Sequence, residues 1–238
     1  MTDLLYMQDI HGCYLKKFDA HVIKQKDDYI ILNKTAFYPQ GGGQPSDTGI
    51  IKWDTTQSQV TEVIKKGIIK HMITGEKPSV GTHIQGIINW EKRYAHMKMH
   101  TAQHILSGIV FDQFRARTVG NQIHDTYSRV DFSPASFTQN DLTTIENSTN
   151  DIIKNDLPLT IYFEKRTSLQ QRVNEQRCNL DLLPQSIDTL RIVEIKGFDI
   201  CPCAGTHVQK TGEIPPITIN KKESKGKDTT RLIYSFSH

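Results

Sequence analysis

Two pairs of candidate metal ligands stand out in this chain. His100 and His104 occur in the segment HTAQH, and Cys203 and His207 occur in the segment CAGTH, so three residues separate the members of each pair. Neutral imidazole nitrogen and thiolate sulfur are the ligands that Zn²⁺ prefers. Because one pair follows the other by about a hundred residues, the sequence predicts one zinc ion held between two distant segments.

The histidine pair lies in a stretch with the pattern of an α-helix. Residues 90–99 contain neither glycine nor proline, and apolar residues follow HTAQH at the spacing of an amphipathic helix. Residues four apart share one face of a helix, so His100 and His104 can point at the same ion. Two histidines on a helix face often bind nothing. The second pair, in a segment that Gly205 allows to bend, is what favours a metal site.

The number of ligands bears on what the ion would do. Four protein ligands are typical of a structural zinc site, whereas a catalytic site keeps one position open. A chain with this many apolar residues does not need a metal to fold, however. If His207 exchanged with water, metal-assisted hydrolysis would become possible. Asp199, four residues before Cys203, is interpreted as an exposed loop acid, with orientation of a metal ligand as the alternative.

A glycine-rich segment is the third unusual motif. Gly41, Gly42 and Gly43 precede Gln44, and this run matches neither the phosphate-binding loop of nucleoside triphosphatases nor the dinucleotide-binding fingerprint. Three glycines let the backbone approach a bulky partner and free its N–H groups to meet phosphates. A tight turn between strands is an equally good interpretation.

Thr118 follows the predicted helix, where the chain turns back towards the metal ligands. Its hydroxyl could hydrogen-bond a hydroxyl group on a small substrate, and a site built in this way discriminates strongly against analogues that lack the group. On position alone, a threonine that opens a strand is the simpler interpretation.

Composition and length limit the class of protein. A chain of 238 residues can form one large or two small domains, and it contains no long apolar run. The N-terminus lacks the basic region of a signal peptide, and four scattered cysteines do not make a disulfide framework. We therefore expect a cytoplasmic protein without a membrane partner. The net charge of +3 neither requires nor excludes a nucleic acid.

The hydrophobic pattern changes near residue 90, which predicts two domains, 1–90 and 91–238. The first reads as β-structure, a small barrel or folded sheet, and the second mixes helices and strands without regular alternation, which favours the α+β class. A helix should run from residue 91 to about residue 114. Strands are expected at 29–32, 128–132, 159–163 and 190–195, and further β-structure at 60–72, with a turn signal at Gly67, and at 82–90. The other expected elements are a helix opened by a capping box at Thr138 and Asp141 and running to 153, a short helix at 168–175, and a hairpin of 217–219 with 231–234.

Taken together, the motifs resemble a known family. They are similar to the motifs of the free-standing alanyl-tRNA editing proteins, the AlaX family, and of the editing domain of alanyl-tRNA synthetase. The matching parts are HTAQH, CAGTH, Arg93 and the segment 37–49 that contains the glycines. Thr206 stands where the related threonyl-tRNA editing domains have proline, and Ala204 where the family more often has glycine. The absence of an aminoacylation domain and of a coiled extension is typical of the medium-length form.

The resemblance implies a fold, a reaction and a partner. We expect a β-barrel-like domain followed by an α+β editing domain with a mostly antiparallel sheet and a long metal-bearing helix. The reaction would be zinc-dependent hydrolysis of alanine tRNA mischarged with serine or glycine. His100, His104, Cys203 and His207 would hold one zinc per chain and act in catalysis. Thr118 would read the amino acid, while Gly41 to Gln44 would engage the acceptor stem near the 3′ end. No DNA partner is expected.

Two other functions are compatible with the same residues. One is a non-catalytic RNA-binding module with a structural zinc, and the other is a hydrolase of small esters, against which the glycine-rich segment argues. Contacts to tRNA phosphates need basic side chains. The candidates are Lys92, Arg93, Lys98, Arg115, Arg117 and the lysines between 221 and 227.

Overall fold

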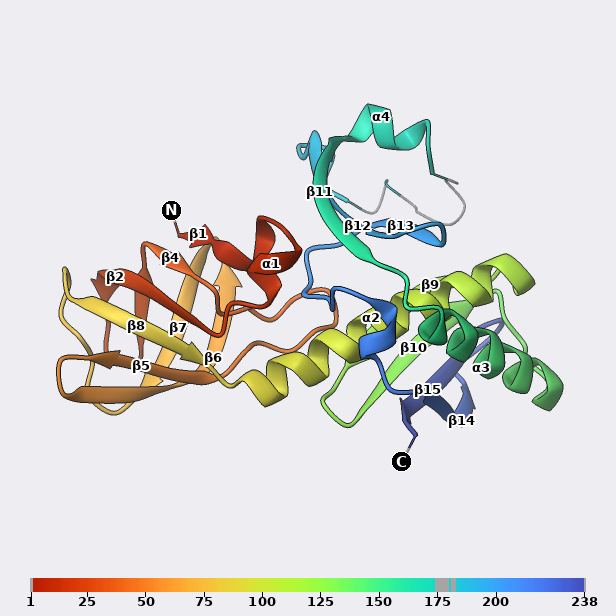
Figure 1. The fold of residues 1–238 in the computed structure, drawn as a ribbon, viewed down its shortest axis with the longest axis horizontal. Coiled ribbons are helices and arrows are strands. Elements are labelled where there is room, and N and C mark those ends of the chain that lie inside the picture. Colours follow the sequence, from red (N-terminus) through yellow and green to blue (C-terminus); the bar gives the residue numbers. More distant parts are fainter. Residues whose placement is uncertain (1, 174–179, 181–182, 238) are drawn as a thin grey trace.

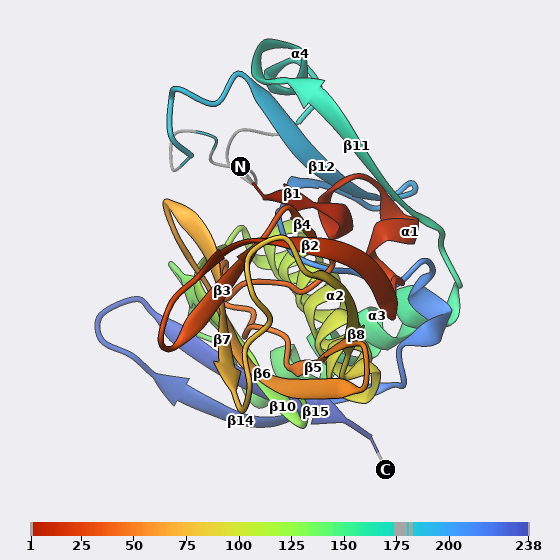
Figure 2. The ribbon, with the colours of Figure 1, turned by 90° about the vertical axis from the view of Figure 1, so that its left-hand side faces the viewer.

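The computed structural model describes residues 2–173, 180 and 183–237. The chain forms an N-terminal barrel and a larger mixed part, which the long helix α2 (Trp90–Phe114) joins (Figure 1). Seen from the barrel end, α2 lies behind the barrel (Figure 2). None of the described helices is both long enough and apolar enough to cross a bilayer.

Six strands close into the barrel in the order β2-β3-β7-β6-β5-β8, and each pairs antiparallel with its neighbours. Alternation places apolar side chains inside, as in β2, where Phe18, Ala20 and Val22 are buried between exposed residues. The barrel strands are β2 (Lys17–Gln25), β3 (Tyr29–Leu32), β5 (Gly49–Trp53), β6 (Thr56–Lys66), β7 (Ile68–Thr74) and β8 (His83–Ile88). A short parallel pair, β1 (Asp3–Leu4) with β4 (Lys34–Thr35), and the helices η1 (Leu5–Met7) and α1 (Ile10–Cys13) lie beside it.

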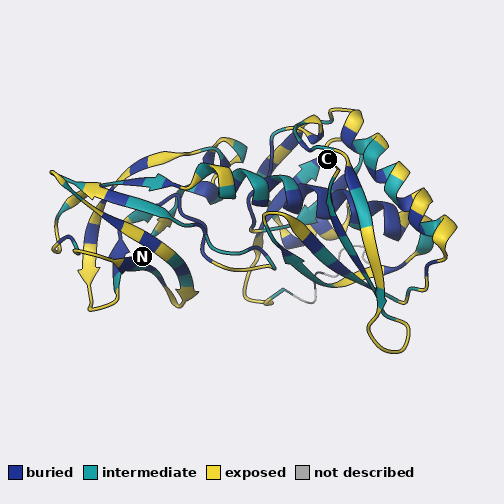
Figure 3. Cartoon of the chain, turned by 90° about the horizontal axis from the view of Figure 1, so that it is seen from below, coloured by how far each residue is buried: buried dark blue, intermediate teal, exposed yellow. Residues whose placement is uncertain are grey.

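Helix α2 is the central element of the larger part. Asn89 caps its N-terminus by accepting a hydrogen bond from the Lys92 backbone N–H, and the left-handed backbone of Arg115 ends it. Its middle is buried on every side, as the dark blue stretch in Figure 3 shows. Polar side chains in that middle therefore need partners inside the protein.

Two antiparallel sheets and a second helix surround α2. One sheet has the order β14-β15-β10-β9 and the other β11-β12-β13, while helix α3 packs against α2. The capping box of Thr138 and Asp141 opens α3, as the sequence predicts. These elements are β9 (Arg117–Ile123), β10 (Tyr127–Ser133), α3 (Gln139–Lys154), β11 (Leu159–Lys165), α4 (Arg166–Gln170), β12 (Thr189–Ile195), β13 (Asp199–Pro202), η3 (Thr211–Glu213), β14 (Ile217–Ser224) and β15 (Thr230–Phe236).

The mixed composition, the mostly antiparallel strands and the closed barrel agree with the predicted class, while the domain division at residue 90 stays a prediction. The expected turn at Gly67 is present, with φ of +72°, and it divides the run 60–72 between β6 and β7. One expected element differs. The short helix expected at 168–175 spans Arg166–Gln170 instead, and its predicted end at 174–175 lies outside the described residues.

A buried ion pair ties α2 to the loop before the barrel strand β5. The guanidinium of Arg93, 0% exposed, donates to both carboxylate oxygens of Asp47 and to the carbonyls of Cys13 and Ala36. Asp47 also accepts from the backbone N–H of Tyr38. The prediction that Arg93 contacts phosphates is therefore wrong, because all of its donors point into the protein.

Candidate metal centre

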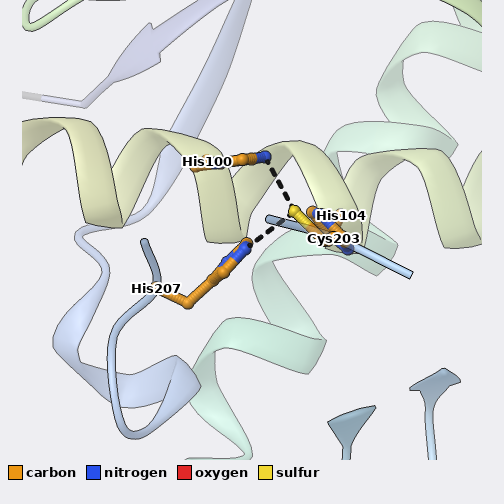
Figure 4. A group of neighbouring side chains, drawn as sticks. All are labelled: His100, His104, Cys203 and His207. Carbon is orange, nitrogen blue, oxygen red and sulfur yellow. Dashed lines mark hydrogen bonds between the residues drawn. The ribbon is translucent and has the colours of Figure 1, made fainter. Parts of the chain in front are cut away.

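The four predicted metal ligands come together in the middle of α2 (Figure 4). His100 and His104 lie one turn apart on the helix, and Cys203 and His207 approach it from the loop after β13. One nitrogen or sulfur atom from each residue lies within 4.8 Å of the others. The Cys203 sulfur lies 3.6 Å from Nε2 of His100 and 3.3 Å from Nε2 of His207.

The two sulfur–nitrogen distances fit a tetrahedral ion. Bonds of about 2.0 Å to nitrogen and 2.3 Å to sulfur place the ligand atoms of a tetrahedral zinc site roughly 3.3–3.8 Å apart. Both sulfur–nitrogen distances lie in that range. The three imidazoles and one thiolate are also the donors that zinc prefers. The group could hold one metal ion, and its chemistry fits zinc.

Gln44 fixes the orientation of His100. Its side-chain carbonyl accepts a hydrogen bond from the backbone N–H of Thr206 at 3.1 Å, and it lies 2.9 Å from Nδ1 of His100. Because a backbone N–H can only donate, the atom of Gln44 at this point is the oxygen. Nδ1 of His100 then carries the proton, and Nε2 keeps its lone pair towards the metal position. The amide NH₂ of Gln44 donates to the Thr206 hydroxyl at 2.8 Å.

Thr101 fixes the orientation of the His207 ring. Its hydroxyl donates to the Met97 carbonyl at 2.9 Å and accepts from the backbone N–H of Val208 at 3.3 Å. It lies 3.1 Å from Nδ1 of His207. Since its single proton is already used, this hydroxyl accepts from Nδ1–H, which again leaves Nε2 for the metal.

Asp199 holds the third imidazole. The interpretation of Asp199 as an exposed loop acid is wrong: the residue is 6% exposed, and its carboxylate lies 3.5 Å from Nδ1 of His104. The reason is that Asp199 begins β13, where it pairs with Ile195 of β12 and faces α2. Each of the three histidines thus has its Nδ1 occupied by a different segment of the chain.

The electrostatics of the group favour a thiolate. Burial opposes ionisation of Cys203, but electrostatic interactions with His100 and His207 and hydrogen bonds with His100 and His104 outweigh it and lower the pKa of the thiol well below the usual value. Burial also lowers the pKa of His207, to about 3. Although burial acts in the same direction on His104, its hydrogen bonds to Asp199 and Cys203 outweigh this and raise its pKa to about 10. A bound dication would therefore displace a proton from the group.

Two further residues shape the loop that carries Cys203. Gly205 lies against His100, and a Cβ atom at this position would collide with the imidazole. The backbone N–H of Gly205 donates to the Cys203 sulfur at 3.3 Å. Arg191 of β12 donates to the Cys203 carbonyl at 2.5 Å and to the Met7 carbonyl at 3.0 Å, so it joins this loop to the N-terminal segment.

A cavity of about 830 Å³ opens beside the ligands and reaches the glycine-rich segment. Gly41 and Gly42 are exposed at its wall, whereas Gln44 is fully buried and faces the metal ligands. Thr118 also lines the cavity, and its hydroxyl lies 2.7 Å from that of Ser107 on α2. The structure thus brings the predicted substrate-contacting residues close to the metal ligands, while their roles stay predictions.

Comparison with known proteins decides the family. The chain is 37% identical to the alanyl-tRNA editing protein AlaX-M of Methanosarcina acetivorans over 99% of both chains. It belongs to the AlaX family. It is also 34% identical to AlaX-L of Pyrococcus horikoshii, over 99% of this chain and 58% of that one. Alanine–tRNA ligase of Thermococcus kodakarensis is 32% identical, over 98% of this chain and 26% of the ligase.

Two family models match this AlaX chain, one before the histidine pair and one after it. The class II (A) tRNA synthetase family matches residues 7–92, which include the barrel and the glycine-rich segment. The second additional domain of threonyl and alanyl tRNA synthetases matches residues 190–233, which include Cys203 and His207. The second model thus covers two of the four candidate ligands, while His100 and His104 lie between the two matched ranges.

Sequence reasoning missed several residues that surround the ligands. Thr101 lies inside HTAQH and Thr206 inside CAGTH, so the motifs themselves contained a signal. Arg191 carried no signal, because only the pairing of β12 with β13 brings it to Cys203.

Proposed function

We propose that this protein hydrolyses the ester of alanine tRNA mischarged with serine or glycine, as a zinc-dependent, free-standing deacylase in the cytoplasm. Its relatives are named alanyl-tRNA editing proteins, which supports tRNA as the substrate class. The observation that carries the proposal is the cluster of four metal ligands next to a cavity of about 830 Å³. A site with a purely structural ion needs no such space.

Different residues of the chain would hold the metal, orient its ligands and contact the tRNA. A zinc ion held by the four ligands would supply a Lewis acid beside the ester. Gln44, Thr101 and Asp199 each lie at the Nδ1 atom of one imidazole, so that its Nε2 atom is turned towards the metal position. The exposed backbone of Gly41 and Gly42 would meet the tRNA acceptor stem near its 3′ end.

The cavity also contains groups suited to the aminoacyl moiety. The hydroxyls of Thr118 and Ser107 form a pair, and Gln103 donates to Ser107 at 2.8 Å. A serine side chain offers one hydroxyl to this chain of polar groups, and glycine offers none. We therefore propose that Thr118 contacts the side chain of the mischarged amino acid.

Basic side chains at the cavity wall support a polyanionic substrate. Lys65 of β6 and Arg117 of β9 both line it, one from the barrel and the other from the larger part. Opposed cations at an opening of this kind attract a phosphate backbone.

The test is deacylation of charged tRNA by the zinc-loaded protein. Alanine tRNA charged with serine should lose its ester far above the uncatalysed rate, whereas the same tRNA charged with alanine should be spared. His100→Ala should abolish the activity. His83→Ala, which changes an exposed residue of barrel strand β8, should retain it. Tight RNA binding without turnover would instead support an RNA-binding module with a structural zinc. Turnover of small serine esters at the same efficiency would support a small-ester hydrolase.

A further inference from the structure

A second cleft lies on the other side of the glycine-rich segment from the metal cavity. It has a volume of about 720 Å³, and the barrel, α2 and the β9–β10 turn line it. Gln40, Gly41 and Asn121 line both spaces, so they form a common wall. A strand of RNA whose terminal ester lay at the metal would thus have a neighbouring place for the residue before it, an inference that rests on the proposed function.

His96 lines this cleft, and one of its ring nitrogens has no partner. The residue lies one turn before His100 on α2 and is 1% exposed, and its Nδ1 atom makes no hydrogen bond to any residue that the structure describes. Burial lowers its pKa to about 4, so the ring is neutral at physiological pH. A neutral imidazole offers one donor and one acceptor, and a buried ring of this kind needs a polar ligand to satisfy it.

Two side-chain amides that line the cleft, those of Gln122 and Asn121, are oriented by hydrogen bonds within the protein. Arg129 donates from Nε to the side-chain carbonyl of Gln122 at 2.9 Å, which leaves the Gln122 NH₂ free to donate. Asn121 is fixed in a similar way, since its NH₂ donates to Gln103 at 3.2 Å. Oriented amides are the groups that read the hydrogen-bonding edges of unpaired bases.

An aromatic pair stands at the rim of the cleft. The rings of His124 and Tyr127 stack with centroids 4.5 Å apart and an interplanar angle of 23°, and Tyr127 is 43% exposed. Stacking on His and Tyr rings is a common way for proteins to hold single-stranded bases.

The charges of the cleft are nearly balanced. Lys92 and Arg129 line it together with Glu62 and Asp125. Lys92 has no ion-pair partner in the described part of the chain, so its ammonium group is available to a ligand. Such a site suits a ligand with one negative charge and many polar edges better than it suits a free multivalent anion.

We propose that this cleft binds one nucleotide of the single-stranded RNA end, the one that precedes the residue held at the metal cavity. The base contacts Gln122 and His96 and stacks at the His124 rim, while the phosphodiester meets Lys92. The protein would then bind the last two nucleotides of the RNA, one in each of the two spaces on either side of the glycine-rich segment.

The test is binding of a short fluorescent RNA that ends in CCA, without an amino acid, to the zinc-loaded protein. Lys92→Ala should raise its Kd about fivefold and reduce the slope of log K against log salt by about 0.7, the value for one phosphate contact on a single strand. Gln122→Ala should raise Kd by a similar factor without changing the slope. Lys154→Ala, an exposed lysine on α3, is the matched control and should bind as the wild type does.

An RNA with an abasic site at the penultimate position distinguishes the contribution of the base contacts from that of the phosphate contact. Gln122→Ala should not affect binding of this RNA, while Lys92→Ala still should. The proposal is overturned if both variants bind the intact RNA within twofold of the wild type, or if Gln122→Ala weakens both RNAs equally. Failure of the wild type to deacylate tRNA would refute the proposed function alone, because the RNA used here carries no ester.

Discussion

The side-chain carbonyl of Gln44 lies 2.9 Å from Nδ1 of His100, although 56 residues separate the two in sequence. Gln44 ends the glycine-rich segment, and the same oxygen accepts from the backbone N–H of Thr206 in the CAGTH loop. One amide therefore joins the glycine-rich segment, the metal-bearing helix and the cysteine loop. The geometry of the candidate metal ligands thus depends on a residue of the segment that is predicted to engage tRNA.

The first prediction concerns this amide. Gln44→Ala removes the acceptor for His100 Nδ1–H, and residues that orient metal ligands typically contribute 10- to 100-fold to metal affinity. We expect zinc affinity to fall in that range, measured by competition with a chromogenic chelator. Gln40→Ala, an exposed glutamine of the same segment, is the control. Equal zinc affinity in the two variants would contradict the role of Gln44.

Gly205 and Ala204 make a matched pair. Gly205→Ala places a methyl group where the His100 imidazole lies, so the ring must move and zinc occupancy should fall. Ala204 is exposed, and Ala204→Gly should keep full occupancy. Metal analysis of the purified variants after dialysis tests both. Full zinc in Gly205→Ala would show that the loop yields and that the contact does not constrain the ligands.

Thr118 should affect which amino acid is removed. Thr118→Val keeps the shape of the side chain but deletes the hydroxyl that pairs with Ser107. We expect kcat/KM to fall about tenfold or more for the seryl tRNA and much less for the glycyl tRNA, because only serine has a hydroxyl to lose. Rates on the two charged tRNAs give the ratio. An equal loss on both would argue that Thr118 supports the cavity wall and does not read the amino acid.

The buried pair of Arg93 and Asp47 should contribute strongly to stability. Arg93→Met leaves the buried Asp47 carboxylate without its partner, and breaking such a pair costs about 3–5 kcal/mol of unfolding free energy. Urea unfolding measures the loss. Adding Asp47→Asn removes the unpaired charge, so the double variant should be more stable than Arg93→Met alone. If the two losses simply add, the residues do not act as a pair.

His71 should make the barrel sensitive to acid. Its ring is completely buried, and burial lowers its pKa from the ordinary 6.5 to about 4. As the pH falls below 6.5, the unfolded chain gains a proton that the folded protein does not. The unfolding free energy should therefore decrease between pH 6.5 and 4, by on the order of 3 kcal/mol in total.

The variant His71→Gln isolates this contribution. Gln can still bond the Thr35 hydroxyl, which lies 2.9 Å from Nε2 of His71, but it does not titrate. The stability difference between the wild type and the variant should shrink as the pH falls from 7 to 4. Effects of acid on the metal ligands cancel in this difference, because both proteins contain them. A constant difference would mean that His71 is not held neutral.

The sequence allowed the metal ligands and their helix to be predicted because both are local patterns. His100 and His104 lie one helical turn apart, and Phe114 ends the helix as expected. What it did not reveal depends on strand pairing. The spacing to Cys203 left two interpretations of Asp199 open, and the pairing of β13 with β12, which brings it to His104, decides between them. The inward position of Gln44 likewise follows from the turn of the glycine-rich segment, not from its composition.

The wide separation of the two ligand pairs has a consequence for biosynthesis. When a ribosome has made the chain as far as residue 200, the whole segment that forms α2, with His100 and His104, has been synthesised, but Cys203 and His207 have not yet been translated. A nascent chain of that length can offer an ion only half of its coordination sphere. Metal loading is thereby coupled to synthesis of the last portion of the polypeptide, and a prematurely terminated product would remain a poor zinc binder even if its barrel folded.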